Sequence, residues 1–212
     1  MPYGVNANSG SSSRTADYQY LILPGSKSSE ISWVEERTDR DNRPIDPNSI
    51  HGFVLSLGYA GYCLYFHPKH QANSRFRYLG REKDKSRAYV IAFAQKPESR
   101  DYLASYYDSN SLETIRFLVQ GLVWVDPNDC HILRIYTRML SPDKKTTLEG
   151  TMTDVSYRKV RFHDNSEFWL PHEVFVSWDF PDYTYTSRHR YSDYHIFTVN
   201  TDYKITQPKI RD

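Results

Sequence analysis

The stretch GLVWVDPNDCHILRIYTRML, residues 121–140, holds two apolar runs joined by a short polar segment. Asp126 and Pro127 suit the first two positions of a type I turn, and the next two residues tolerate the rest of it. The stretch therefore predicts a β-hairpin with arms at about 117–125 and 131–140. Both faces of the first arm are apolar, whereas an antiparallel sheet usually buries only one face. We therefore expect something to cover the second face of this sheet.

Turn signals recur along much of the chain and divide it into short segments with strand character. Two early strands are predicted at 18–23 and 31–38, and the segment 97–113 reads as a long loop with room for a helical turn. A shift of apolar parity between Val155 and Val160 suggests a bulge or a strong twist. From residue 74 onward the pattern predicts one continuous antiparallel sheet. Its seven strands are expected at about 74–81, 86–96, 114–125, 131–140, 151–163, 168–179 and 183–199.

One helix is predicted in HGFVLSLGYAGYCLYFHP, residues 51–68. Its apolar stripe consists of Phe53, Leu57, Ala60 and Leu64, which follow one another at spacings of four, three and four residues. Pro68 is expected to end it. We therefore expect an α+β fold that is mainly β, with a curved antiparallel sheet (a half-open β-barrel) and one or two helices on its concave face.

Length and composition agree with a β-rich protein. The 212 residues include 18 Tyr and 10 Phe, and tyrosine is a strand former with a polar tip. A net charge of +1 gives no overall field to attract nucleic acid or an anionic membrane. The longest apolar run, residues 53–66, is too short to span a bilayer, so no transmembrane segment is expected.

The chain is expected to contain a disordered lead-in (1–17), one domain (18–199) and a polar tail (200–212). The lead-in is rich in Ser, Asn and Gly, and it has no basic start followed by an apolar segment. It therefore does not read as a secretory signal. Either the protein stays in the cytoplasm or the chain lacks its true beginning.

The apolar residues of the inner strands and of the helix are the candidate ligand-binding residues. If a cavity exists between sheet and helix, it would accept an apolar ligand, and each buried methylene of that ligand would contribute up to about 0.8 kcal/mol. The alternative is ordinary core, which residue parity does not distinguish from a hollow. The candidates are Phe53, Leu57, Leu64, Ile91, Phe93, Leu118, Leu122 and Trp124.

The polar residues that are candidates for a metal site or a catalytic site have weaker support from the sequence. His67 and His70 have a spacing that suits a metal, but Pro68 lies between them and no third ligand is near in sequence. Asp193, His195 and His189 share one strand parity, but no nucleophile accompanies them. We expect no enzyme, no cofactor and no metal. Cys63 and Cys130 fit either a reduced pair or a disulfide.

Two stretches, SRFRYLGR and YTYTSRHRYSDYH, interleave basic and aromatic residues as single-strand nucleic-acid platforms do. A solvated sheet face with tyrosine–arginine pairs across strands explains the same pattern. The low net charge favours this second interpretation, so no nucleic-acid partner is expected.

The hairpin GLVWVDPNDCHILRI resembles a hairpin of lipoprotein-carrier (LolA/LppX-like) bacterial proteins. Four further segments resemble uncharacterised exported bacterial proteins associated with that fold: RFRYLGRE, AYVIAFAQKP, FWLPHEVFVSW and RHRYSDYHIF. The resemblance covers about residues 18–199. It implies a half-closed antiparallel β-barrel with helices on its concave side and a cavity for acyl chains.

Together these observations favour a non-enzymatic binding module of the bacterial envelope, periplasmic or exported. Its expected partner is a lipid or lipoprotein acyl chain, or an envelope protein. The alternative is a structural or protein-interaction domain with a filled core, part of a larger exported protein.

Overall fold

The structure is a computed structural model that describes residues 19–24, 33–39, 41, 43–44, 59–84, 86–99, 104–108, 113–142 and 147–196. The predicted lead-in (1–17) and tail (200–212) lie outside these residues, as do the expected ends of the domain.

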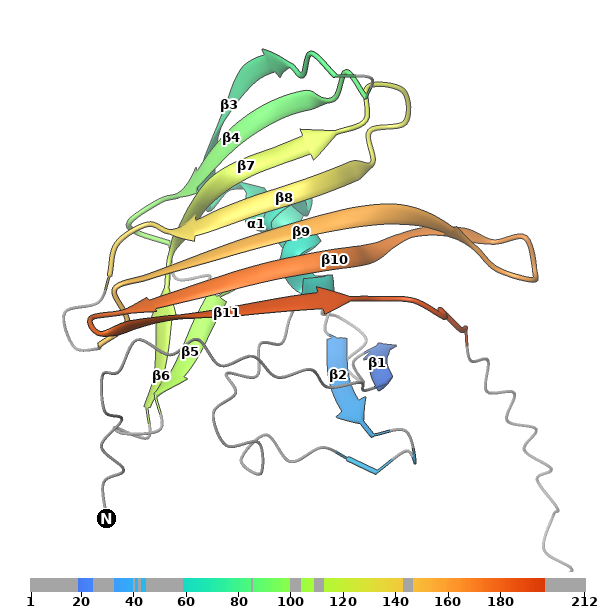
Figure 1. Ribbon diagram of the computed structural model, residues 1–212. Coiled ribbons are helices and arrows are strands. Elements are labelled where there is room, and N and C mark those ends of the chain that lie inside the picture. Colours follow the sequence, from blue (N-terminus) through green and yellow to red (C-terminus); the bar gives the residue numbers. More distant parts are fainter. Residues whose placement is uncertain are drawn as a thin grey trace, which may run out of the picture.

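A seven-stranded antiparallel sheet forms the body of the protein (Figure 1). This confirms the predicted mainly-β α+β fold with a curved sheet, which does not close into a barrel. The strands lie in the order β11-β10-β9-β8-β7-β4-β3, so most neighbours in the sheet are also neighbours in the chain. Their bounds are β3 Ser74–Arg81, β4 Tyr89–Gln95, β7 Val119–Val125, β8 Ile132–Met139, β9 Gly150–Arg161, β10 Glu167–Phe180 and β11 Tyr183–Arg190.

The predicted hairpin at 121–140 is confirmed, as β7 and β8. The Asp126 N–H donates to the carbonyl of His131 (2.8 Å), and the Cys130 N–H donates to the carbonyl of Asp126 (3.0 Å). The Asp126 carboxylate accepts from the Asn128 N–H at 2.7 Å. The loop is closed by Cys130 in the left-handed region, with φ of 60°. The loop therefore comprises four residues, 127–130, and it ends one position later than the turn predicted at 126–129.

The predicted strand 114–125 is wrong as a single strand, because the chain breaks at Leu118. Strand β6 (Glu113–Phe117) leaves the large sheet and pairs with β5 (Ala104–Asp108). This places a strand where a loop with a helical turn was expected. At the break, the Gln95 side chain accepts a hydrogen bond from the Val119 N–H at 2.8 Å. The buried amide thus replaces a backbone partner that the interrupted ladder does not supply.

Other strands follow the sequence pattern closely. Two early strands, β1 (Gln19–Pro24) and β2 (Trp33–Thr38), pair with each other as an antiparallel sheet. The parity shift expected near residue 157 coincides with a bulge in β10, between Pro171 and Glu173. The last strand is shorter than predicted and stops at Arg190. Asp193, with φ of 53°, is incompatible with a continuing strand.

The helix predicted over residues 51–68 is a 3₁₀ helix, not an α-helix, in most of the part that the structure describes. Residues 51–58 lie outside the described part of the chain, and Tyr59–Phe66 form a 3₁₀ helix, η2. A 3₁₀ helix has three residues per turn, so residues i and i+3 eclipse. Tyr59, Tyr62 and Tyr65 have this spacing and lie in one row. A one-turn α-helix, α1 (Pro68–Gln71), follows, so Pro68 begins a helix where it was expected only to end one.

The tyrosine row packs on one face of the sheet, which we call the helix-covered face. Tyr65 lies 5.8 Å from Phe93 between ring centroids, and the Tyr62 hydroxyl donates to Thr153 at 3.1 Å. At the other end of the row, the Tyr59 ring lies 5.1 Å from that of His189. The row therefore crosses the sheet from β4 to β11. The buried hydrophobic core to which this row belongs comprises Tyr59, Tyr65, Phe93, Ala104, Phe117, Val119, Leu148, Val155, Val174, Val176, Trp178 and Phe180.

Gly121 sets the close approach of β7 to β8. A Cβ atom at this position would lie 1.8 Å from the carbonyl oxygen of Tyr136, well inside contact distance. Glycines in strands often mark such close backbone approaches in curved sheets. Any side chain here would separate the two strands.

Candidate functional site

The predicted ligand-binding residues that the structure describes lie on both faces of the sheet and so do not line one cavity. Side chains on a strand alternate between faces, and partners across the ladder share a face. Ile91 and Phe93 lie on the helix-covered face. Leu122 pairs with Ala92 and therefore lies on the opposite face, which we call the outer face. Leu64 is half-buried on η2 and Leu118 is half-buried at the strand break, while Phe53 and Leu57 lie outside the described residues.

Trp124 also lies on the outer face, which corrects its expected place between sheet and helix. Its cross-strand partner is Arg134, and the Arg134 guanidinium carbon lies 4.6 Å from the indole centroid. The indole N–H donates to the Glu82 carboxylate at 3.2 Å. The alternation of β7 explains this position, because Val123 takes the buried place on the helix-covered face with 1% exposure. Trp124 is held by polar partners and lines no interior.

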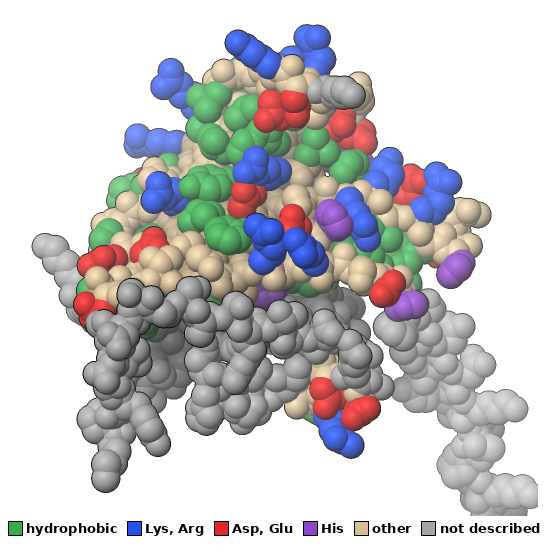
Figure 2. Space-filling model, viewed as in Figure 1, with side chains coloured by type: hydrophobic (Ala, Val, Ile, Leu, Met, Phe, Trp, Pro, Cys, Tyr) green, Lys and Arg blue, Asp and Glu red, His purple; other side chains and the backbone are tan. Residues whose placement is uncertain are grey.

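The outer face carries an apolar patch mixed with arginines. Figure 2 shows hydrophobic side chains gathered on this face, with Lys and Arg among them, while Figure 1 shows the short helices behind the sheet. The patch is built by the second parity of the central strands, which the sequence already showed to be apolar. Its half-buried members are Val90, Ala92, Ala94, Leu122, Trp124, Tyr136, Met152 and Phe175.

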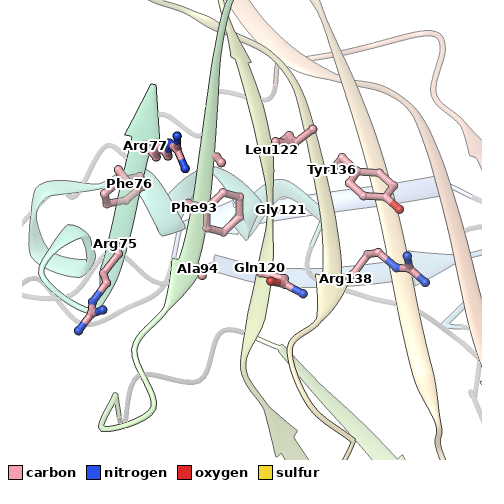
Figure 3. A pocket seen from close by; sticks show the side chains of 11 residues that line it. Arg75, Phe76, Arg77, Phe93, Ala94, Gln120, Gly121, Leu122, Tyr136 and Arg138 are labelled. Atoms are coloured by element: carbon pink, nitrogen blue, oxygen red, sulfur yellow. The ribbon is translucent and has the colours of Figure 1, made fainter. Parts of the chain in front are cut away.

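A shallow hollow of about 450 Å³ lies over β3, β4, β7 and β8 within this patch (Figure 3). Its floor is low because the outer-face residues Ala92 and Ala94 have small side chains. Leu122 and Tyr136, which pair across β7 and β8, add larger apolar surface. The full lining comprises Arg75, Phe76, Arg77, Ala92, Phe93, Ala94, Gln120, Gly121, Leu122, Tyr136 and Arg138.

Three arginines border the hollow. Arg75 and Arg77 project from β3 at one side, and Arg138 projects from β8 at the other (Figure 3). All three are exposed, and within the described part of the chain none forms an ion pair or a hydrogen bond through its side chain. Free guanidinium groups bind carboxylate and phosphate in bidentate geometry. The hollow therefore combines an apolar floor with uncompensated positive charge.

The neighbouring part of the outer face is different, because its arginines are already paired. The Arg134 Nε donates to the Asp154 carboxylate at 2.8 Å, and this contact raises the pKa of Arg134. Arg188 and Arg190 both reach Glu173, at 3.6 and 3.3 Å. A second hollow of about 370 Å³ lies among these pairs. It offers no free charge to an anion.

Between the sheet and η2, tyrosine hydroxyls are buried. Burial raises the pKa of Tyr62, although the hydrogen bond with Thr153 opposes this shift. Burial raises the pKa of Tyr65 and of Tyr157 well above the ordinary value, and neither hydroxyl has a hydrogen-bond partner among the described residues. These phenols therefore stay neutral at physiological pH. Their surroundings are packed core.

The histidine and cysteine candidates occupy separate places. The His67 imidazole accepts from the Lys69 N–H at 3.2 Å and caps α1, and its ring centroid lies 6.2 Å from that of His70. His189 lies 3.0 Å from the Ser187 hydroxyl. Within the described residues no group of three or more His, Cys, Asp or Glu side chains could hold a metal ion. Cys63 and Cys130 are free thiols, which decides against the disulfide.

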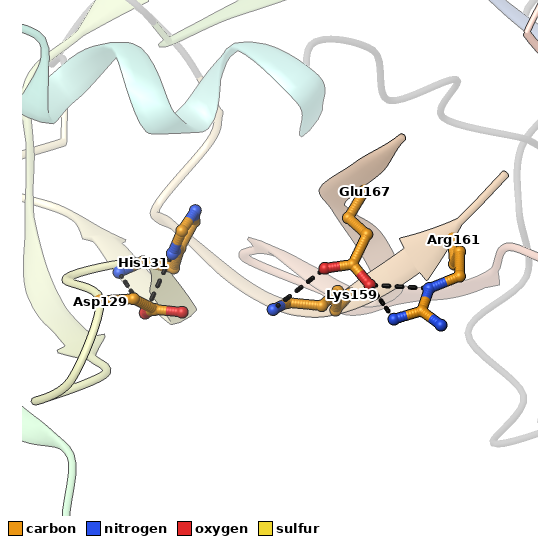
Figure 4. A network of polar contacts seen from close by, with 5 residues as sticks. All are labelled: Asp129, His131, Lys159, Arg161 and Glu167. Carbon is orange, nitrogen blue, oxygen red and sulfur yellow. Dashed lines mark hydrogen bonds and ion pairs between the residues drawn. The ribbon is translucent and has the colours of Figure 1, made fainter. Parts of the chain in front are cut away.

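Two groups of polar contacts lie at the ends of two hairpins, one in the β7–β8 hairpin and one in the β9–β10 hairpin (Figure 4). His131 contacts the Asp129 carboxylate at 2.9 Å, and hydrogen bonds from His131, first from its backbone, lower the pKa of Asp129. Arg161 and Lys159 hold Glu167, and the Arg161 hydrogen bond is the main cause of the lowered pKa of Glu167. The Asp129 carboxylate is thus held by His131, and the Glu167 carboxylate by two cations. Each group therefore holds together the end of its own hairpin.

Comparisons with protein-family models, with curated proteins and with solved structures find no match to this chain. The resemblance to lipoprotein-carrier proteins stays a prediction. None of the helices that the structure describes has the length and apolar character needed to cross a bilayer.

Sequence reasoning missed the arginines of the hollow as ligand-binding residues. The sequence marks Arg75 and Arg77 only as part of a basic and aromatic stretch, and no pattern marks Arg138. One signal was present: the two β3 arginines share a parity, as do the small residues Ala92 and Ala94 of the next strand. Only the register between β3 and β4 shows that these arginines and alanines are cross-strand partners on one face of the sheet.

Proposed function

We propose that this protein is a non-enzymatic binding module whose ligand is an anionic amphiphile held in the outer-face hollow. The acyl chain lies over Ala92, Ala94 and Leu122, and the carboxylate or phosphate head contacts the arginines at the rim. The observation that carries the proposal is the coincidence of an apolar floor with three guanidinium groups that have no partner among the described residues. This keeps the expected lipid-like ligand but moves it from the sheet–helix interior to the outer face.

The core supports this placement of the ligand. Phe93, Val123 and Val155 are each at most 3% exposed, so the centre of the helix-covered face is filled by side chains. Both hollows described above lie on the outer face. An acyl chain would have to displace core side chains to enter the interior, whereas it meets open apolar surface outside.

Calorimetric titration with alkyl carboxylates and alkyl phosphates of increasing chain length tests the proposal. A methylene that is half removed from water gains about 0.4 kcal/mol, so each added carbon should tighten Kd by about twofold. An uncharged detergent of equal chain length should bind at least tenfold more weakly, since it lacks the head group. Single-stranded oligonucleotides serve as the competing anion.

Two variants separate the contribution of the ligand's charged head group from that of its acyl chain. Replacing Arg75, Arg77 and Arg138 together by Gln should abolish the preference for charged heads, and Leu122→Gln should flatten the dependence on chain length. Arg116→Gln is the matched control, because Arg116 is exposed on β6 and does not line the hollow. Affinity that ignores chain length, or oligonucleotide binding in place of amphiphile binding, would overturn the proposal.

A location in the bacterial envelope belongs to the same proposal and is supported only by the resemblance to exported bacterial proteins. Fractionation of cells that express the full gene product tests it. Recovery of the protein in the cytosolic fraction alone would contradict the envelope location and leave the ligand proposal standing.

A further inference from the structure

Among the strands that the structure describes, β3 lies at one edge of the large sheet and pairs only with β4 (Figure 1). In an antiparallel pair, every second residue of an edge strand points its N–H and C=O away from its neighbour. Such an edge is a template on which another strand can add. Three large apolar side chains remain open to solvent here: Phe76 is 42% exposed, Tyr78 58% and Leu79 52%.

The two faces of β3 have different chemistry. Phe76 and Tyr78 lie on the helix-covered face and extend an aromatic row, since Phe76 stacks at 6.4 Å from Phe93 and Tyr78 lies 6.0 Å from Tyr89. Arg75 and Arg77 lie on the outer face with no ion pair among the described residues. An added strand would therefore need apolar residues on one face and acidic residues on the other.

Charge distinguishes between two possible occupants of the β3 edge, a second copy of this chain and a strand of another protein. A second copy of this chain would bring the arginines of β3 beside those of its partner, and like charges across a strand pair are destabilising. The opposite edge, β11, offers no matching acidic row, because its outer-face residues Arg188 and Arg190 are basic and are held by Glu173. An acidic strand from another protein meets neither obstacle.

We propose that β3 is a docking edge for an extended acidic segment of another protein, which adds to the sheet as an eighth strand with alternating acidic and apolar side chains. The ladder supplies affinity through backbone hydrogen bonds, and Arg75 and Arg77 select the charge of the partner. This site shares two arginines with the proposed amphiphile site but depends on backbone groups that the amphiphile does not use.

Fluorescence anisotropy with a labelled peptide of alternating Glu and Val tests the proposal. Two N-methylated versions of the peptide, methylated on all Glu or on all Val residues, are the decisive probes. Strand addition uses the N–H groups of one set only, so one version should lose at least tenfold in affinity and the other should stay within about threefold. A Lys–Val peptide should bind at least tenfold more weakly, and Arg75→Glu with Arg77→Glu should invert this preference.

Leu122→Gln keeps the two proposals apart, because it alters the floor of the hollow but not the edge. It should leave peptide affinity unchanged while it weakens the chain-length dependence of amphiphile binding. Equal binding of both N-methylated peptides, binding of the Lys–Val peptide as tightly as the Glu–Val peptide, or no binding at all would overturn the edge proposal. The N-methyl comparison uses the unaltered protein, so it stands even if the charge-reversed variant fails to fold.

Discussion

The guanidinium of Arg134 lies over the indole of Trp124, with its Cζ atom 4.6 Å from the ring centroid. The same indole donates a hydrogen bond to Glu82, and Arg134 is fixed by Asp154. A large apolar side chain on the open face of the sheet is thus covered by charged groups from a neighbouring strand and a neighbouring loop. This arrangement explains how β7 can be apolar on both faces although the helices cover only one.

We expect Trp124→Phe to lower the free energy of unfolding by about 1–2 kcal/mol. The change removes the hydrogen bond to Glu82 and weakens the contact with Arg134. Trp169→Phe is the matched control, since the Trp169 N–H is buried without a partner among the described residues. Urea denaturation measures both variants. Equal losses would show that the hydrogen bond from the Trp124 indole to Glu82 contributes nothing.

The row of tyrosines on η2 offers a second matched pair. Tyr62→Phe should cost about 1 kcal/mol, because it removes the donor to Thr153 in a buried setting. Tyr65→Phe should be neutral or stabilising by up to about 1 kcal/mol, because its hydroxyl is buried and has no partner among the described residues. Thermal and urea unfolding decide the order of the two, and a more damaging Tyr65→Phe would contradict the assignment.

Gly121→Ala should destabilise the protein by at least about 3 kcal/mol or prevent folding, since the new methyl group would overlap the Tyr136 carbonyl. Gly61→Ala is the control. There an added Cβ meets only the Leu64 Cδ1 at 3.8 Å, and alanine should stabilise the helix by about 0.5–1 kcal/mol. Circular dichroism checks folding and urea midpoints give the energies; a well-tolerated alanine at 121 would be incompatible with the observed strand approach.

Alkaline conditions should unfold the protein through its buried phenols. The pKa values of Tyr62, Tyr65 and Tyr157 are raised in the folded state, so above about pH 10 the unfolded chain loses protons that the folded protein keeps. Stability is therefore fully present below the unfolded pKa and falls as the pH rises toward the folded one. The slope is about 1.4 kcal/mol per pH unit for each phenol.

Urea midpoints across this range, followed with tyrosinate absorbance, test the alkaline prediction. The double variant Tyr65→Phe with Tyr157→Phe should show a shallower fall by about 3 kcal/mol per pH unit, which is the slope of two phenols. A fall of unchanged steepness would assign the alkaline transition to other groups.

The order of most strands in the sheet could be predicted because the turns between them are short and are recognisable in the sequence. Turns such as 126–129 place each strand next to the preceding one, so the order of β7 to β11 follows from the chain itself. The break at Leu118 was not predictable, since the apolar alternation runs through it. Strand β5 was hidden in a polar segment that looks like a loop.

The kind of helix and the face of Trp124 also escaped prediction, for physical reasons. A row of tyrosines every three residues matches neither the 3.6-residue period of an α-helix nor the two-residue period of a strand. In β7 both parities are apolar, so alternation alone does not say which one meets η2. The hollow needs cross-strand register, because Ala92, Leu122 and Tyr136 come from three different strands.

Among the described strands of the large sheet, one pair departs from sequential order, β4 with β7, and we expect this pair to set the order of folding. Joining these strands closes the segment 96–118, at an entropic cost of about 3 kcal/mol, whereas β7 to β11 assemble through short connections. We expect the C-terminal hairpins to form first and β3 with β4 to join last. Native-state hydrogen exchange should therefore show amides of β3 opening at lower free energy than those of β8 and β9, and uniform protection across the sheet would rule this sequence of events out.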